Sequence, residues 1–206
     1  MSSRRLRSWT AFAGVVSIAS VCGCWSQARP YNYAAEPDPI GQEYVLGPSD
    51  VLRINVWHNA EFAGDVIIRP DGTISLPLLG DLRAAGRTPG QLRADIAARL
   101  TTFIKDDSAI VTVSVSAVNS YRFVVSGNIE HPGVFTANHY VRVTEAVALA
   151  GGPNRFASPE ASVIIRLNAD PKGPVRRIPI DYVGILDGHH PEQNLRLLPG
   201  DTVYIP

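Results

Sequence analysis

The sequence predicts an α+β fold made of two small mixed domains, and three observations support this prediction. The 16 prolines and 17 glycines favour many short strands and turns over long helices. Several stretches alternate apolar and polar side chains with the period of two that is typical of half-buried strands. Two further stretches have the apolar spacing of a helix that covers a sheet, and the roughly 165 residues after the N-terminal region suffice for two small domains.

Residues 1–23 have the pattern of a bacterial lipoprotein signal peptide. A positively charged start is followed by an uncharged apolar stretch up to Val21, which is too short for a permanent membrane-spanning helix. Aliphatic Val21 stands three residues before Cys24 and small Gly23 directly before it, whereas Cys22 follows the bulky Val21. We therefore expect Cys24 to be acylated and to attach the mature chain to a membrane through its lipid. The alternative is an ordinary secretory signal with two incidental cysteines.

Charge and cysteine content narrow the possible functions. Residues 1–23 contain three arginines and no acid, so the rest of the chain has 16 basic and 19 acidic side chains, a formal net charge of −3. Nucleic-acid binding needs a clustered basic face, and this composition argues against it. Because Cys22 and Cys24 are the only cysteines, no disulfide can form within the mature chain.

Residues 24–42 are expected to form a tether, since their prolines and small polar residues show no sustained period. Such a segment would keep the folded body away from the membrane that holds the lipid. Tyr31 and Tyr33 are candidates for docking on that body, although nothing local indicates where.

The first folded domain is expected over residues 43–119. Thr88 can cap a helix that begins at Pro89, Gln91 completes a capping box, and the apolar face extends to Phe103 and Ile104. Strands are expected at 51–56, 66–69, 74–76 and 109–118, the third returning from the second through an Asp-Gly turn at 71–72.

The second domain, residues 120–206, has a similar pattern of strands and one helix. A short helix from Thr144 is expected to end at Gly151 and Gly152, because glycine adopts a left-handed conformation at little cost. Residues 46–54 and 197–205 both have a proline, a small residue and an aspartate before an alternating strand. This predicts the same turn twice, with the aspartate accepting backbone N–H groups. Strands are expected at 121–125, 134–135, 162–167, 177–180 and 201–205.

No catalytic arrangement is evident, and the sequence argues against an enzyme. It has no nucleophile elbow, phosphate-binding loop or metalloprotease helix motif, and no carboxylate pair on matching elements for glycan hydrolysis. His189 and His190 are adjacent and project differently, so a solvated loop is favoured over a metal site. Asp71 and Asp81 lie in or beside turns, where turn formation is favoured over acid–base catalysis. We expect no cofactor and no metal.

Two surface candidates have alternative interpretations. Trp57 could stack on the face of a sugar, but the area that a tryptophan buries favours a buried anchor. Lys172, Arg176 and Arg177 form a small basic cluster. A solvated surface is favoured for this cluster over a contact with an acidic glycan.

Several motifs resemble those of the bacterial polysaccharide export outer-membrane lipoproteins, which secrete capsule and exopolysaccharide. Residues 44–57, with Tyr44–Leu52 at their start, are similar to the opening strand of the family's export domain, and Arg69–Gly80 to its most distinctive segment. Residues 120–206 are similar to one soluble-ligand-binding β-grasp (SLBB, ubiquitin-like) domain. The matching segments are Val125–Gly127, Pro132–Gly133, Ala148–Gly152 and Leu198–Asp201.

The resemblance implies a periplasmic or outer-membrane lipoprotein that forms an oligomeric conduit for capsular or extracellular polysaccharide. Its implied partners are further copies of itself in a homo-oligomeric ring, an inner-membrane polysaccharide co-polymerase and the polysaccharide, and in this role it performs no chemistry. Trp25 is not the aspartate that usually signals retention in the inner membrane. We therefore expect lipid anchoring to the periplasmic face of the outer membrane.

One departure from the family pattern affects this expectation. Larger members carry a second β-grasp domain and a C-terminal amphipathic helix that crosses the outer membrane, whereas this chain ends at Pro206 after an expected strand. We therefore expect a short form that lacks the C-terminal membrane helix and works with a separate outer-membrane β-barrel. The alternative is a lipid-anchored periplasmic module that binds a glycan or small ligand without a conduit. Formation of a closed ring would distinguish the two.

Overall fold

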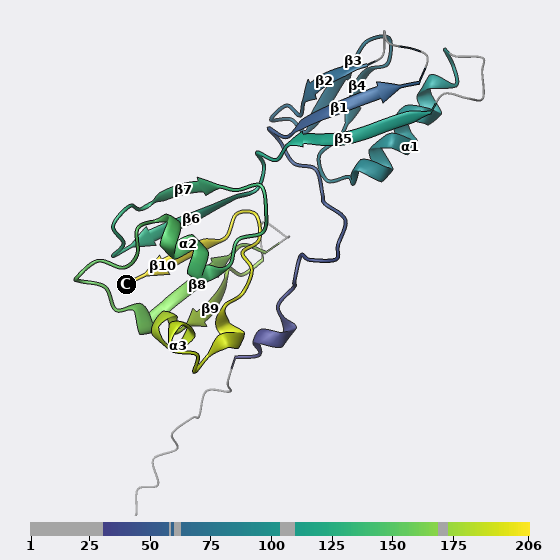
Figure 1. The fold of residues 1–206 in the computed structure, drawn as a ribbon. Coiled ribbons are helices and arrows are strands. Elements are labelled where there is room, and N and C mark those ends of the chain that lie inside the picture. The colour runs from purple at the N-terminus through teal and green to yellow at the C-terminus, as the bar shows by residue number, and fades with distance from the viewer. Residues whose placement is uncertain (1–30, 58, 60–62, 104–109, 169–172) are drawn as a thin grey trace, which may run out of the picture. The chain divides into compact units, whose positions relative to one another are not determined.

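The computed structural model describes residues 31–57, 59, 63–103, 110–168 and 173–206. Within these ranges the strands and helices form an N-terminal group before Asn119 and a C-terminal group after it (Figure 1). Each group has its own sheet, helix and buried apolar cluster, which confirms the predicted α+β fold class. None of the helices in the described ranges is both long enough and apolar enough to span a bilayer.

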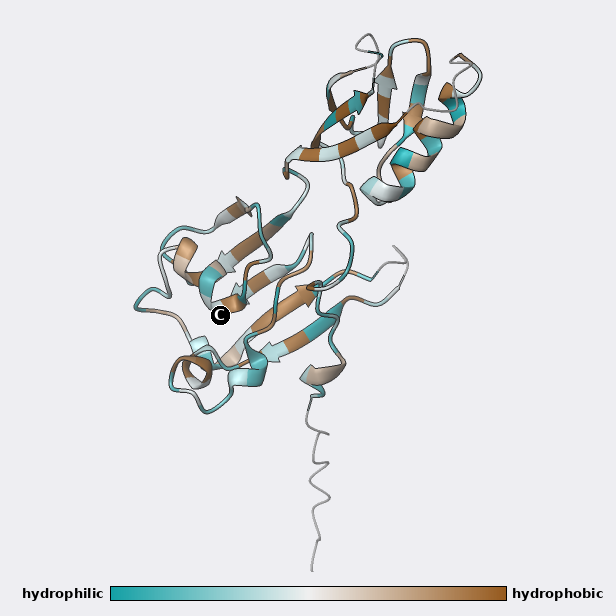
Figure 2. Cartoon of the chain, turned by 45° about the vertical axis from the view of Figure 1, so that its right-hand side comes forward, coloured by the Kyte–Doolittle hydropathy of each residue, from teal (hydrophilic) through white to brown (hydrophobic). Residues whose placement is uncertain are grey.

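The N-terminal group contains a three-stranded antiparallel sheet in the order β2-β1-β5. Helix α1 (Pro89–Leu100) packs against β5. Apolar and polar bands alternate along the strands (Figure 2), and the side chains buried from β1 are Leu52, Ile54 and Val56. The strands are β1 (Val51–Val56), β2 (Gly64–Ile67), β5 (Val111–Ala117) and, in a separate hairpin, β3 (Thr73–Leu76) and β4 (Gly80–Arg83).

The predicted pairing of residues 74–76 is wrong. They return against β4, with Ile74 opposite Leu82, and not against the strand that precedes the Asp-Gly turn. Positive φ angles at Leu78 (63°) and Gly80 (68°) produce the second tight reversal that makes the β3–β4 hairpin possible. Burial of both Ile74 and Leu82 then favours this pairing.

The start of α1 is as predicted, whereas its end is not. The Thr88 side chain accepts a hydrogen bond from the Gln91 backbone N–H, and the Gln91 side chain accepts one from the Thr88 N–H, completing the capping box. The helix ends at Leu100, and Phe103 beyond it is 53% exposed, so the apolar face does not extend that far. Ile104 lies outside the described residues.

The C-terminal group is a five-stranded mixed sheet in the order β7-β6-β10-β8-β9. Strand β10 runs parallel to β6 and antiparallel to β8, so the last strand of the chain joins two antiparallel pairs into one sheet. The bounds are β6 (Arg122–Gly127), β7 (Gly133–Thr136), β8 (Ser162–Arg166), β9 (Arg176–Ile180) and β10 (Thr202–Ile205).

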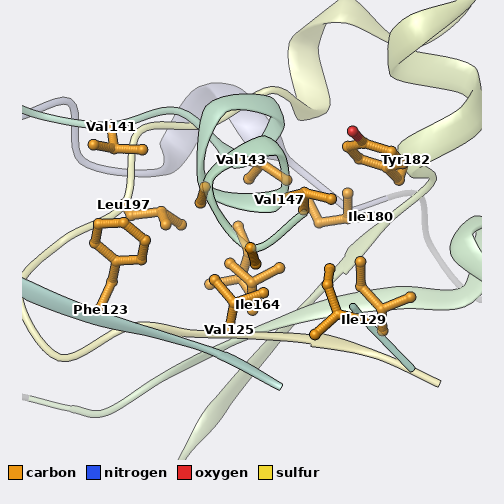
Figure 3. Packing of buried hydrophobic residues seen from close by; sticks show 14 of the residues in the cluster. Phe123, Val125, Ile129, Val141, Val143, Val147, Ile164, Ile180, Tyr182 and Leu197 are labelled. Atoms are coloured by element: carbon orange, nitrogen blue, oxygen red, sulfur yellow. The ribbon is translucent and has the colours of Figure 1, made fainter. Parts of the chain in front are cut away.

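Helix α2 (Val143–Leu149) covers this sheet, and Gly151 and Gly152 just beyond its end both have a φ of 85°, the left-handed conformation predicted for them. Figure 3 shows α2 side chains, including Val143 and Val147, above side chains from the sheet. Helix α3 (Tyr182–Leu186) was not predicted from the sequence. The described residues also include three single-turn 3₁₀ helices: η1 (Tyr33–Ala35), η3 (Pro159–Ala161) and η4 (Pro191–Gln193).

The predicted repeated turn occurs at two buried aspartates, Asp50 and Asp201. Oδ2 of Asp50 accepts a hydrogen bond from the Gly47 N–H (2.9 Å), and Oδ2 of Asp201 accepts one from the Leu198 N–H (2.7 Å). The residue before each aspartate has a left-handed backbone, with φ of 77° at position 49 and 87° at position 200. The two sequences thus form the same turn, as their shared pattern predicts.

The carboxylate of Asp50 also holds two neighbouring segments together. It accepts hydrogen bonds from the backbone N–H groups of Asn119 and Ser120 (both 2.8 Å), from the Ser120 hydroxyl (2.9 Å) and from the Tyr44 hydroxyl (2.7 Å). With the bond from the Gly47 N–H, this fully buried side chain accepts five hydrogen bonds. Its negative charge is therefore stabilised by directed donors instead of water.

Candidate functional site

A pocket in the C-terminal group is built around Tyr121, directly before β6. The residue is 2% exposed, and its hydroxyl donates to the Leu197 carbonyl (3.1 Å) and accepts from the Val141 N–H (3.0 Å). Burial raises the pKa of this hydroxyl above its ordinary value. Both ends of the side chain are thereby fixed, and the ring is a rigid support for what packs on it.

Two further tyrosines line the pocket. The ring of Tyr140 meets Tyr121 edge to face, with 5.4 Å between ring centroids and an interplanar angle of 84°. Tyr140 is half-buried, and its hydroxyl has no hydrogen-bond partner among the described residues. The Tyr44 hydroxyl donates to Asp50, and burial raises its pKa well above the ordinary value. The pocket therefore has aromatic walls whose positions are set by the surrounding fold.

Polar side chains from one short segment and the start of α2 also line the pocket. His139 Nε2 lies 2.8 Å from Glu145 Oε1, and His139 Nδ1 lies 3.1 Å from the side-chain oxygen of Asn138. Arg142, the residue before α2, donates through Nη1 to the Asn194 carbonyl (2.7 Å). Carboxylate, amide, imidazole and guanidinium groups are thus gathered close to the tyrosine rings.

The pocket has a volume of about 470 Å³, within the range of roughly 300–1,000 Å³ that is usual for small-ligand sites. The lining residues are Ile40, Tyr44, Val118, Tyr121, Asn138, His139, Tyr140, Arg142, Glu145 and Arg196.

A buried ionic cluster lies in the same group and consists of Glu36, Arg166, Arg176 and Asp201. Arg166 donates to Asp201 through Nε (2.9 Å) and Nη2 (2.6 Å) and to Glu36 through Nη1 (2.9 Å). The side chains of these three residues are at most 5% exposed. Arg176 pairs with Glu36 from a more exposed position, so two cations meet two anions.

The ionic cluster fastens residues 31–38 to the C-terminal group. Tyr33 donates through its hydroxyl to the Pro179 carbonyl (2.8 Å), and Arg196 pairs with Asp38 (2.7 Å). The Tyr31 hydroxyl contacts Glu36 and accepts from Arg176 (3.2 Å). These contacts locate the docking place of Tyr31 and Tyr33, which the sequence left open.

The structure assigns different surroundings to the sequence candidates. Cys24 lies outside the described residues. Trp57 is 63% exposed, so the expectation of a buried anchor is wrong: it directly follows the end of the central strand β1, beside exposed Ile110. Asp71 has the turn role expected of it, accepting from the Thr73 N–H (3.0 Å). Asp81 accepts from the Ser75 hydroxyl and pairs with Arg69 in the β3–β4 hairpin.

The basic and histidine candidates do not come together as a site. Lys172 lies outside the described residues, Arg176 belongs to the ionic cluster, and Arg177 is exposed. His189 and His190 are exposed in the loop after α3. In the described part of the chain, no group of three or more His, Cys, Asp or Glu side chains is placed to hold a metal ion.

Sequence reasoning missed both the pocket and the ionic cluster. The pocket joins Tyr121 to the segment around Tyr140 and to Arg196, which are far apart in the chain. Glu36 meets Arg166 across 130 residues of sequence. The one local signal was the density of polar residues and tyrosine just before α2, a position where loops carry binding groups.

The described residues thus form two helix-covered α+β groups, and a pocket of the size usual for small ligands is lined mainly by the C-terminal one. Residues 38–116 match the family model described as polysaccharide biosynthesis/export protein, and residues 122–179 match the SLBB domain model. The chain therefore contains a polysaccharide biosynthesis/export domain followed by an SLBB domain.

Named relatives agree with this assignment. The exopolysaccharide production protein ExoF of Rhizobium meliloti is 34% identical over 125 residues, 55% of this chain and 29% of that protein. The EPS I polysaccharide export outer membrane protein EpsA of Ralstonia solanacearum is 30% identical over 135 residues, 54% of this chain and 35% of that protein. The capsule polysaccharide export outer membrane protein CtrA of Neisseria meningitidis is 26% identical over 137 residues, 66% of this chain and 33% of that protein. The chain thus spans only about a third of these curated relatives.

Proposed function

We propose that this protein is a lipid-anchored component of a machine that exports capsular or extracellular polysaccharide. After removal of residues 1–23, acylated Cys24 holds the chain on the periplasmic face of the outer membrane. Residues 24–42 connect the lipid to an export domain, residues 43–119, which is followed by an SLBB domain, residues 120–206. The protein acts by assembly and binding, without chemistry of its own.

The observation that carries this proposal is the succession of the two matched domains in one chain. An export domain at 38–116 followed by an SLBB domain at 122–179 is found here behind an N-terminal pattern that predicts acylation at Cys24. Relatives of this chain are named for polysaccharide export and for the outer membrane. The predicted lipid anchor and the two matched domains therefore support the same role.

The proposed assembly is a ring of identical copies that surrounds the path of the glycan. Exposed Trp57 and Ile110 are adjacent in the export domain, where the Trp57 N–H donates to the Ile110 carbonyl (2.9 Å). An apolar pair of this kind, with tryptophan in it, suits a contact between copies. The remaining proposed partners are an inner-membrane polysaccharide co-polymerase and a separate outer-membrane β-barrel.

Deletion and complementation test the proposal. A strain without this protein should lose surface and secreted polysaccharide, and the wild-type gene should restore both. The Cys24→Ala variant should be made in normal amount but should restore little, because it lacks the lipid anchor. Normal surface polysaccharide in the deletion strain would contradict the export role. In that case a monomeric, lipid-anchored ligand-binding module becomes the better description.

A further inference from the structure

We propose that the tyrosine-lined pocket around Tyr121 and Tyr140 binds one neutral pyranose ring. The pocket is the 470 Å³ cavity around Tyr121 and Tyr140 described above. The proposal deepens the proposed function, on which it rests for the source of the sugar, a glycan that passes this protein. The sugar class itself is argued from the side chains of the pocket.

The aromatic walls match the apolar face of a sugar ring. A pyranose presents several C–H groups on one face and hydroxyls around its edge, so it packs on an aromatic ring while its hydroxyls remain free for hydrogen bonds. Tyr121 is buried and its hydroxyl is fixed by two hydrogen bonds, so it supports Tyr140, which rests on it edge to face and is the half-buried ring that a sugar can reach. A wall fixed before the ligand arrives loses little conformational entropy on binding.

The polar groups match the hydroxyls at the edge of the ring. The Tyr140 hydroxyl is without a partner in the described part of the chain and can both donate and accept. Glu145 uses Oε1 toward His139, which leaves Oε2 as an acceptor. Arg142 uses Nη1 toward the Asn194 carbonyl, which leaves other N–H donors. These donors and acceptors suit the hydroxyls of a sugar, each of which can both donate and accept a hydrogen bond.

The charge balance favours a neutral sugar over an anionic ligand. Arg142 and Arg196 are the cations of the pocket. Glu145 lies in the same lining, and Asp38, which is not a lining residue, pairs with Arg196 at 2.7 Å, so the two arginines are balanced by one carboxylate in the pocket and one beside it. Recognition of phosphate or of an acidic group needs an excess of cationic donors, which this balance does not provide.

Saturation-transfer NMR on the purified, membrane-extracted protein tests the proposal directly. The probes are methyl β-D-glucopyranoside, methyl β-D-galactopyranoside and methyl α-D-mannopyranoside, and the detergent must have no sugar headgroup. At least one probe should receive saturation mainly at the C–H protons of one ring face. Tyr140→Ala should lower the affinity for that probe roughly tenfold, and Tyr140→Phe, which keeps the ring, should lower the affinity less.

Controls make each outcome decisive. Phe156→Ala removes an exposed aromatic ring elsewhere in the domain and should leave probe binding unchanged. Absence of saturation for all three neutral probes would overturn the proposal, as would binding that survives Tyr140→Ala. Binding of methyl glucuronoside alone would show that the pocket selects acidic sugars and would contradict the charge argument. Because the readout is binding, it stands apart from the polysaccharide phenotype of the deletion strain, so each proposal can fail without the other.

Discussion

The buried ionic cluster predicts a large loss of stability in the variant Arg166→Met. Arg166 is the direct partner of both Glu36 and Asp201, whose side chains are no more than 2% exposed. After the substitution Glu36 keeps Arg176, but Asp201 keeps only the Leu198 N–H as a donor among the described residues. Removing one partner of a buried pair costs about 3–5 kcal/mol, because the other charge is left uncompensated.

The assay is urea unfolding of the purified protein followed by far-ultraviolet circular dichroism. With a denaturant slope of about 1–3 kcal/mol per molar urea, the expected loss lowers the unfolding midpoint by roughly 2 M. Arg177→Met is the matched control, since Arg177 is exposed on β9 opposite Ile165, and it should change stability by less than about 0.5 kcal/mol.

A double variant tests whether the loss of stability comes from the uncompensated charge of Asp201. Arg166→Met with Asp201→Asn removes both charges, so it should recover part of the stability lost in Arg166→Met alone. If Arg166→Met proves as stable as Arg177→Met, the cluster contributes little and the reasoning from burial is refuted.

Three further predictions follow from single positions. Asp50→Ala removes the acceptor of five hydrogen bonds and should cost about 3 kcal/mol or more in urea unfolding, whereas a cost below about 1 kcal/mol would contradict its role. Gly127→Ala should lower the free energy of unfolding by about 3 kcal/mol or more, because the new Cβ would lie 2.0 Å from the Ile205 carbonyl oxygen. The control Gly188→Ala has a φ of 77° but open space around the new Cβ, so it should lower stability by only about 1–2 kcal/mol. Equal losses of stability in the two variants would refute the steric argument. Burial raises the pKa of Tyr44 well above its ordinary value near 10, so its contribution to stability is complete below about pH 10 and is lost as the pH rises toward the folded-state pKa. The urea midpoint should therefore fall as the pH rises above about 10, and it should fall less in Tyr44→Phe.

Local chemistry made part of the fold predictable. The capping box at Thr88 and Gln91 needs only residues three apart, and the glycine ending of α2 needs only its last turn. The similar turns at Asp50 and Asp201 likewise depend on only four consecutive residues each. In these places the sequence and the structure agree because the determining contacts are short in sequence.

Contacts between distant residues were not predictable in this way. Whether β3 pairs with β2 or with β4 depends on which apolar faces are buried together, and the strand pattern is the same in both cases. The position of Trp57 depended on what the rest of the sheet covers, which its local sequence does not encode. Glu36 belongs to an irregular segment, and nothing in the local sequence indicates that it contacts Arg166, 130 residues further along the chain. The pocket residues were missed for the same reason.

The most direct test of the central claim is where polysaccharide accumulates when this protein is absent. The glycan should be measured separately in the cytoplasmic, periplasmic and surface fractions of the deletion strain and of the complemented strain. An export role predicts that surface glycan falls while glycan inside the cell envelope rises, and that the wild-type protein reverses both changes. Equal amounts in every fraction of the two strains would contradict the account.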